Sequence, residues 1–299
     1  MSKIIDKFLY SLVWLLTSPP LNLLYFVSAL FYLLIQYVIG YRKKITYKNL
    51  TLSFPEKSEK EIRVIMKKFF KHLCDFSIES LKSIHLTQKQ LDKRLKYENT
   101  EIFEDLYNEK KDIALVSGHY GNWEWIANLP SKISHKLLII YRPLKVKFID
   151  KMIFDNRSKF GTVMIPMKDI YKEILRYKER NEQIVVWFLV DQRPPRRNKY
   201  WTKFLNQDTA FYTGFDKIAK KLDMAVVFMH IDKIKRGYYN VQFKKLYENT
   251  SELPDFEITD KVIKTLEDSI VNKPEYWLWS HNRWKHKMEQ TEKTLQVTI

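Results

Sequence analysis

The sequence predicts an α/β fold with a mostly parallel sheet flanked by helices, preceded by an N-terminal membrane-anchoring helix. Two patterns carry this prediction. Short apolar segments alternate with amphipathic ones through the middle of the chain, which is typical of strands joined by crossover helices. Before them, residues 8–41 contain no charged side chain. The expected strands are residues 113–116, 137–141, 162–165, 184–190 and 225–231, and the expected helices are residues 146–160, 168–180 and 213–222.

Further elements surround this alternating region. Ser58 and Glu61 have the spacing of a capping box, and apolar side chains at three-four spacing continue from them as an amphipathic helix to about residue 83. A polar, lysine-rich passage at residues 87–100 separates this helix from the first strand. The remaining expected elements are a hairpin loop at residues 232–240, an edge strand at residues 241–246 and a helix at residues 259–271.

The N-terminal apolar region predicts contact with a membrane. As a helix, residues 21–40 are about 30 Å long, which is the thickness of a bilayer core. Pro19 and Pro20 separate this stretch from a shorter apolar segment at residues 8–16. A buried core helix is the alternative for the longer stretch. A cleaved signal peptide is disfavoured, because no small-x-small cleavage site follows the shorter segment and a second apolar stretch comes immediately after it.

The charges that flank the apolar region predict its orientation. Four basic residues follow it and two precede it, and the heavier cluster normally stays in the cytoplasm. These residues are Arg42, Lys43, Lys44 and Lys48 on one side, and Lys3 and Lys7 on the other. We therefore expect residues 1–41 to be a membrane anchor, and residues 42–299 to form a single domain whose lysines lie against anionic headgroups.

Composition limits the classes of partner. The chain has 299 residues and a formal net charge of +17, so its partners are expected to carry negative charge, as anionic lipid, phosphorylated substrate, nucleic acid or an acidic carrier protein do. The single cysteine, Cys74, permits no intrachain disulfide and no cysteine-based zinc cluster. It lies in a helical apolar pattern, and we expect a buried side chain rather than a nucleophile.

A candidate catalytic motif follows the first predicted strand. His119 and Glu124 are five positions apart in a segment with the pattern of strand, tight turn and helix start. Such a turn can fold the carboxylate back to accept a hydrogen bond from one ring nitrogen, which leaves the other nitrogen basic. The pair can then take a proton from a hydroxyl group as it attacks an acyl carbon. A turn histidine that caps a helix is the alternative, because this spacing is common by chance.

Polar residues also follow the other predicted strands. Arg142 lies after one strand, Arg157 precedes the next, and Asp191 and Gln192 follow the most apolar one. Each has an ordinary alternative as a surface arginine, a helix-end charge or a helix cap. Because parallel strands end at one edge of a sheet, we expect these side chains to gather near the histidine. Guanidinium groups there, extended by the basic loop at residues 193–203, suit an anionic substrate held through phosphate.

Several common catalytic patterns are absent from the sequence. It contains no G-x-S-x-G, P-loop, G-x-G-x-x-G or H-E-x-x-H pattern, and only six glycines. Hydrolysis through an acyl-serine, nucleotide-driven chemistry and zinc proteolysis are therefore disfavoured. Direct attack of a substrate hydroxyl on an activated acyl donor remains.

Several ordered blocks resemble the lipid A biosynthesis acyltransferase family. They are Tyr41-Arg42-Lys43-Lys44, Asn49-Leu50, Phe54-Pro55-Glu56, the motif at residues 119–124, Tyr141-Arg142-Pro143, Arg157 with Phe160-Gly161, Asp191-Gln192, and residues 274–279 with Arg283-Trp284. The resemblance runs from the anchor to about residue 285. It implies an α/β acyltransferase at the cytoplasmic face of the cell inner membrane. Its implied reaction moves an acyl chain from an acyl carrier protein thioester to a hydroxyl of a lipid A precursor, with no metal, other cofactor or covalent intermediate.

The resemblance also implies roles for single residues. His119 and Glu124 are the catalytic pair, with the histidine as general base, and Arg157 and Asp191 act in activity or binding. Asn122, or the backbone amides of the turn, is expected to stabilise the oxyanion. The basic surface would meet membrane phospholipid, the anionic glycolipid acceptor and the acidic carrier protein.

Two other functions remain open from the sequence. Nothing in these blocks names the acceptor, so O-acylation of another membrane lipid, such as an amino-acid lipid or a phospholipid, is the enzymatic alternative. A membrane-tethered basic binding protein is the non-enzymatic alternative. Nucleic acid is not expected as a partner, because no helix-turn-helix, RNP or zinc-finger pattern appears.

Overall fold

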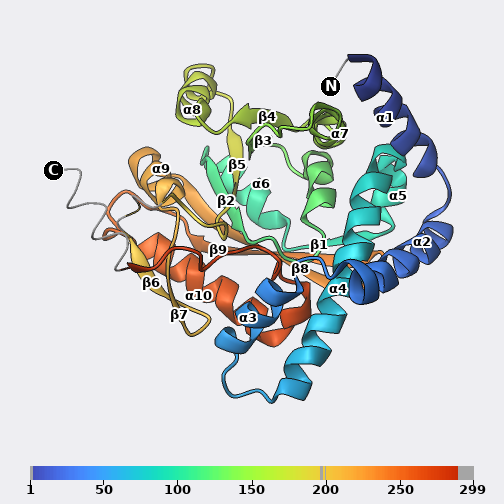
Figure 1. Ribbon diagram of the computed structural model, residues 1–299. Helices are drawn as coiled ribbons and strands as arrows, with labels where there is room; N and C mark the ends of the chain where they lie inside the picture. The colour runs from blue at the N-terminus through green and yellow to red at the C-terminus, as the bar shows by residue number, and fades with distance from the viewer. Residues whose placement is uncertain (1–2, 196–197, 199, 289–299) are drawn as a thin grey trace.

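The computed structural model describes residues 3–195, 198 and 200–288, and its centre is a seven-stranded sheet in the order β1-β9-β8-β2-β5-β3-β4 (Figure 1). Neighbouring strands of this sheet are parallel except β8 and β9, which form an antiparallel hairpin. The predicted α/β class is therefore confirmed. The strands are β1 (Leu95–Glu98), β2 (Ile113–Ser117), β3 (Lys136–Tyr141), β4 (Val163–Pro166), β5 (Ile184–Leu189), β8 (Ala225–Lys235) and β9 (Tyr238–Tyr247).

Apolar clusters cover both faces of the sheet. Successive side chains of β2 alternate between them, since Ala114 and Val116 belong to one cluster and Ile113 and Leu115 to the other. Strands that are buried on both faces need nearly continuous apolar residues, which is why these strands were recognisable in the sequence. The first cluster includes side chains from α4 (Glu59–Lys82), α8 (Ile170–Glu179), α9 (Gly214–Leu222) and α10 (Glu257–Asn272), and the second includes side chains from α5 (Gln88–Asp92), α6 (Glu101–Asn108) and the 3-10 helix η3 (Trp123–Ser131).

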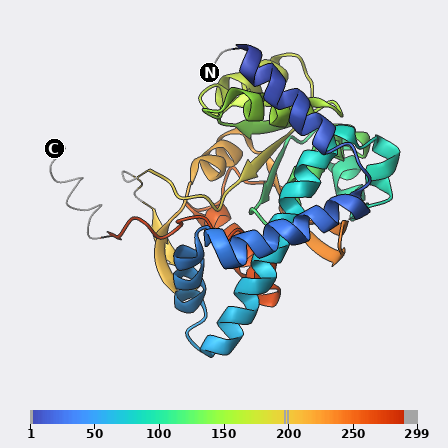
Figure 2. The same ribbon diagram turned by 45° about the vertical axis from the view of Figure 1, so that its right-hand side comes forward.

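The N-terminal helices pack against the outside of this body. Helix α1 contacts α7 (Lys147–Ser158), and α2 lies against α4 (Figure 2). Helix α2 and the π-helical turn η1 together form an apolar helix, Leu21–Ile39, that is long enough to cross a membrane, and only 22% of it is buried. That exposure argues against the buried core helix considered above. The segments are α1 (Lys3–Leu16), α2 (Leu21–Leu34), η1 (Ile35–Ile39) and α3 (Lys43–Ser53).

Three predictions of position are wrong. The lysine-rich passage contains β1, which pairs with β9, so β9 is not an edge strand. The hairpin loop is shorter than expected, because β8 continues to Lys235 and β9 begins at Tyr238. The loop after β5 contains a second small sheet, the hairpin of β6 (Trp201–Phe204) and β7 (Gln207–Ala210). In all three places the strands carry exposed polar side chains, which hide the apolar pattern of a buried strand.

The amphipathic helix predicted from Ser58 is confirmed as α4. The Ser58 hydroxyl accepts from the backbone N–H of Glu61, and the carboxylate of Glu61 accepts from the backbone N–H of Ser58. Cys74 is buried on this helix, as expected. Helix α4 also contacts two short 3-10 turns, η2 (Ser83–His85), which follows it directly, and η4 (Pro274–Tyr276).

Candidate active site

The candidate catalytic histidine lies in the turn that follows β2. Gly118 and Gly121 bracket this turn, and neither position has room for a larger side chain. A Cβ atom on Gly118 would lie 2.7 Å from Leu266 Cδ1, and one on Gly121, where φ is +65°, would lie 2.7 Å from the backbone oxygen of Ile231. The turn therefore holds His119 closely against its neighbours at the carboxyl end of β2.

The partner of His119 is Asp191, which follows the adjacent strand β5. His119 Nδ1 lies 2.6 Å from Asp191 Oδ1, and the backbone N–H of His119 donates to Asp191 Oδ2 over 2.7 Å. Both residues are buried, with exposed fractions of 7% and 3%. The expected hydrogen bond between His119 and Glu124 is wrong. Because β2 and β5 are paired parallel strands, their ends lie side by side, and the carboxylate of Asp191 reaches the ring instead.

The surroundings of Asp191 decide which ring nitrogen carries the proton. Burial alone would raise the pKa of this carboxyl, but its interactions with His119 and the indole N–H of Trp277 hold that pKa at about 2. Trp277 Nε1 donates to Asp191 Oδ2 over 2.7 Å. An ionised carboxylate only accepts, so His119 Nδ1 donates and Nε2 keeps its lone pair. The amide nitrogen of Gln192, an exposed side chain, lies 3.1 Å from Nε2 and can donate to it.

Glu124 forms an ion pair with Arg157. Arg157 Nε donates to Glu124 Oε2 over 2.9 Å, and Nη2 donates to Oε1 over 2.7 Å. Burial acts to raise the pKa of Glu124, but the charge and hydrogen bonds of Arg157 outweigh it and leave that pKa below its ordinary value. The ring of Trp123 connects this pair to the histidine: its Nε1 donates to Glu124 Oε1 over 3.1 Å, and its centroid lies 5.1 Å from that of His119. Arg157, expected to hold an anionic substrate, is thus engaged by Glu124.

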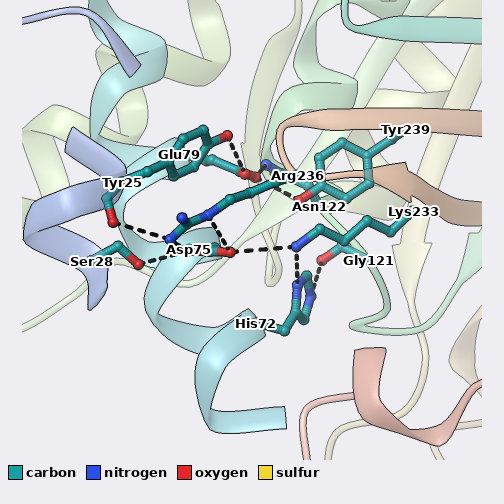
Figure 3. Close-up of polar contacts among 10 residues, drawn as sticks. All are labelled: Tyr25, Ser28, His72, Asp75, Glu79, Gly121, Asn122, Lys233, Arg236 and Tyr239. Atoms are coloured by element: carbon teal, nitrogen blue, oxygen red, sulfur yellow. Dashed lines mark hydrogen bonds and ion pairs between the residues drawn. The ribbon is translucent and has the colours of Figure 1, made fainter. Parts of the chain in front are cut away.

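Asn122 points into a buried polar cluster behind the turn (Figure 3). Its Nδ2 donates to Glu79 Oε2 over 2.7 Å, and its Oδ1 accepts from the backbone of Trp125. Glu79 also accepts from the hydroxyls of Tyr25 and Tyr239 over 2.7 and 2.6 Å. Burial raises the pKa of Glu79, although these donors act in the opposite direction. The side chain of Asn122 therefore fixes the turn to α4.

The expected oxyanion donors of the turn are already engaged in this conformation. The backbone N–H groups of three consecutive turn residues donate to Asp191, to the Gly118 carbonyl and to the Tyr276 carbonyl; these residues are His119, Tyr120 and Gly121. The amide of Asn122 is bonded to Glu79. The oxyanion donor therefore stays a prediction, with the Asn122 side chain and these three backbone amides already engaged in this conformation.

A second polar group supports the turn from α4 and the β8–β9 hairpin (Figure 3). Arg236 Nε donates to Asp75 Oδ2 over 2.9 Å, and Lys233 Nζ lies 3.6 Å from the same oxygen. His72 Nε2 lies 3.3 Å from the backbone oxygen of Gly121. Burial lowers the pKa of His72 to about 3, so the ring is neutral and donates to that oxygen.

The segment after η4 completes the site from the end of the chain. The backbone N–H of Leu278 donates to the carbonyl oxygen of His119 over 3.2 Å, and Tyr120 and Trp277 form an isolated antiparallel bridge. The sequence indicated this segment only as a family block rich in tryptophan. The roles of Trp277 and Glu79 were missed, because their partners are more than 40 residues away and no local pattern links them.

The remaining predicted substrate-binding residues form no hydrogen bond with His119 or lie outside the described residues. Arg142 is exposed after β3, and Arg193 Nη1 donates to the backbone oxygen of Asn282 over 2.8 Å. Arg196, Arg197 and Lys199 lie outside the described residues. Beside the Trp123 ring a small, mostly apolar hollow of about 10 Å³ is lined by Phe69, His72, Leu73, Phe76, Trp123, Tyr276, Trp277 and Leu278. A larger hollow lies over β8 and β9, and none of the predicted site residues lines it.

No group of three or more metal-binding side chains is found among residues 3–195, 198 and 200–288. The polar side chains of the site instead bond to one another. They make a buried His–Asp pair whose Nε2 faces the exposed side chain of Gln192, an adjacent Glu–Arg pair and a small, mostly apolar hollow. This arrangement can deprotonate a hydroxyl group next to an apolar chain.

Comparison with known proteins gives a consistent result. A family model described as bacterial lipid A biosynthesis acyltransferase matches residues 1–286. The chain is 25% identical over 282 residues to a lipid A biosynthesis lauroyltransferase of Escherichia coli strain K12, covering 93% of this chain and 90% of the relative. It is 23% identical over 259 residues to a lipid A biosynthesis acyltransferase of Haemophilus influenzae, covering 85% and 81%. A lipid A biosynthesis palmitoleoyltransferase of Escherichia coli strain K12 is 20% identical over 275 residues, with 91% and 88% covered.

Proposed function

Because the chain belongs to the bacterial lipid A biosynthesis acyltransferase family and is an acyltransferase, we propose that it moves a fatty acyl chain from an acyl carrier protein thioester to a hydroxyl of an anionic lipid A precursor. The proposed place of reaction is the cytoplasmic face of the inner membrane, with residues 1–41 as the anchor. The observation that carries the proposal is the buried hydrogen bond between His119 Nδ1 and Asp191, which turns Nε2 toward the exposed side chain of Gln192.

The proposed reaction begins when the acceptor hydroxyl displaces the amide of Gln192 from His119 Nε2. The ring takes the hydroxyl proton as the oxygen attacks the thioester carbonyl carbon, and Asp191 stabilises the imidazolium through Nδ1. Collapse of the tetrahedral intermediate forms the ester and breaks the carbon–sulfur bond. The imidazolium then returns its proton to the leaving thiolate, so the enzyme ends in its starting state.

Glu124 keeps a catalytic role in this proposal, but not as the group that orients the ring. Its negative charge interacts with His119 as well as with Arg157, and it therefore favours the imidazolium form that develops during proton transfer. The bidentate contact fixes the Arg157 guanidinium beside the dyad. The acyl chain is proposed to approach over Phe76, Trp123 and Leu278, whose hollow of about 10 Å³ would have to widen to admit it.

The net charge of +17 supports both proposed partners, since acyl carrier proteins are acidic and lipid A precursors are anionic. One observation keeps a second acceptor class in view. Arg157 is engaged by Glu124 and Arg193 by the backbone of Asn282, so among the described arginines predicted to bind the acceptor only Arg142 is exposed. An acceptor without phosphate, such as an amino-acid lipid, would not need a free guanidinium.

The test is an assay with purified protein in detergent, an acyl carrier protein thioester and a lipid A precursor, alongside mass spectrometry of total lipids with and without the gene. We expect His119→Ala to lower turnover by about 10²–10⁴. A phosphatase-treated acceptor should react more slowly if phosphate is recognised. An unchanged rate with the treated acceptor would favour the second acceptor class, and full activity of His119→Ala would overturn the mechanism.

A further inference from the structure

Both ends of the apolar helix formed by α2 and η1 are tied to the same body. At the N-terminal end, Lys82 Nζ from the end of α4 donates to the backbone oxygen of Ser18 over 2.7 Å. At the C-terminal end, Arg42 Nη1 donates to the backbone oxygen of Ser280 over 2.9 Å. A helix that crosses a bilayer from one aqueous side to the other carries its folded domain at one end. Here the domain holds both ends.

The body also contacts the helix along its length. One stripe of α2 is buried, at Leu21, Leu24, Tyr25 and Ser28, and Tyr32 and Ile35 continue it with partly buried side chains packed on the core. This three-four spacing is a single helix face. The opposite face is exposed, with fractions between 41% and 73% at Leu23, Phe26, Leu30, Phe31, Leu33, Leu34 and Tyr37.

The buried stripe lies on charged side chains. Tyr25 donates to Glu79, Ser28 donates to Asp75 over 2.6 Å, and Arg236 reaches both Asp75 and the backbone oxygen of Tyr25 (Figure 3). If α2 crossed the bilayer, this network would lie at hydrocarbon depth. A central charged residue costs about 2.5–3.5 kcal/mol on membrane-insertion scales, so a crossing helix in this arrangement is disfavoured.

The exposed apolar surface extends beyond α2. Of the 28 large apolar side chains exposed in the described chain, 17 lie between Ile4 and Tyr41. Helix α1 carries seven of them, from Ile4 to Leu16, and α7, which contacts α1, adds Ile149 and Phe154. Basic side chains accompany this surface, among them Lys7, Arg42, Lys44, Lys147 and Lys151. An apolar face with accompanying cations fits an anionic lipid surface.

We propose that α1 and α2 lie in the plane of one membrane leaflet and do not cross the bilayer, so that both ends of α2 and the body are on the same side. This inference rests on the proposed membrane location. It gives the N-terminal region a different role from that of a tether. The bilayer surface then meets the body along α1, α2 and α7, and α2 remains bonded to the cluster that holds the catalytic turn.

The test is a labelling experiment on the full-length protein in membrane vesicles. The background variant is Cys74→Ala, which removes the single buried thiol, and Lys7→Cys or Lys44→Cys then places one thiol on either side of α2 at an exposed position. A membrane-impermeant maleimide is added to inverted and to right-side-out vesicles, with detergent-solubilised samples as the reactivity control. We expect both thiols to be labelled in inverted vesicles alone.

Opposite sidedness would overturn the proposal: Lys7→Cys labelled only in right-side-out vesicles and Lys44→Cys only in inverted ones. A reporter fused before Met1 gives a second reading, because green fluorescent protein there should fluoresce, whereas an active alkaline phosphatase there would contradict the proposal. A wrong prediction of the membrane location can be told apart from a wrong orientation of α2. In that case, the unmodified protein would appear in the soluble fraction at low salt without detergent, before any labelling.

Discussion

Replacing Asp191 with asparagine should convert His119 into the wrong tautomer. The carboxylate accepts three hydrogen bonds, from His119 Nδ1 to Oδ1 and from the backbone N–H of His119 and Trp277 Nε1 to Oδ2. An asparagine side chain has one oxygen and one NH₂ group. If the NH₂ group takes the place of Oδ2, it faces two N–H donors. If it takes the place of Oδ1, it donates to Nδ1 and forces the proton onto Nε2.

The magnitude follows from the cost of the first orientation. Each buried donor left without an acceptor costs about 1–3 kcal/mol, so facing two of them costs about 2–6 kcal/mol. The second orientation is therefore strongly favoured, and in it Nε2 has no lone pair for the acceptor hydroxyl. Since about 1.4 kcal/mol corresponds to a factor of ten, we expect Asp191→Asn to lower turnover by about 10²–10⁴.

The assay is steady-state transfer from the acyl carrier protein thioester, with both substrates varied. Turnover should fall while KM for each substrate changes little, because the fold and the substrate contacts are kept. Glu124→Gln is the comparison variant, since the sequence predicted that Glu124 orients the His119 ring. If Glu124→Gln reduced turnover strongly and Asp191→Asn had no effect, the ring would be oriented by the motif acid and the argument from this structure would be refuted.

Three other outcomes are expected. The pKa of Asp191 is lowered from 3.8 to about 2 in the folded protein, so its ionised form contributes about 2 kcal/mol to the free energy of unfolding. This contribution should be present above pH 4 and lost as the pH falls toward 2. Urea unfolding of the wild type, but not of Asp191→Asn, should show the loss. Glu124→Gln should lower stability by about 1–3 kcal/mol, since it leaves the largely buried Arg157 charge unpaired. Arg157→Gln in the same chain should restore part of it, and equal melting temperatures for the single and double variants would contradict this. Deleting residues 1–40 should give an aggregated, inactive protein, since it uncovers Glu79 and Asp75, and a monodisperse active product in size-exclusion chromatography would contradict the packing of α2.

The sequence predicted the elements whose burial leaves a local pattern. Strands β2 and β5 read as apolar runs because both faces are covered, and the capping box of α4 was visible at Ser58. Strand β1 was missed, because it pairs at the sheet margin and alternates polar with apolar residues over only four positions. Helix η3 was expected as an ordinary helix start, since apolar spacing does not distinguish a 3-10 helix from an α-helix over so few residues.

The site shows the same division. Parallel topology correctly brought the residues after β2 and β5 to one edge, so His119 and Asp191 were both in the candidate set. Which carboxylate bonds the ring depends on how closely the ends of the neighbouring strands approach each other, and the spacing of residues in the sequence does not give that distance. Glu124 was predicted to orient the ring because it is near His119 in the sequence. In the structure its carboxylate is paired with Arg157, 33 residues later.

The late position of Trp277 and Leu278 sets an order of events during synthesis. The apolar helices leave the ribosome first and can reach the membrane while the rest of the chain is still being made. The histidine turn follows, but the indole that bonds Asp191 and the amide that bonds the His119 carbonyl are among the last of the described residues to be translated. On the proposed function, a nascent chain would therefore reach the membrane before its catalytic turn is complete. A truncated product that stops before residue 277 would occupy the membrane as an inert copy.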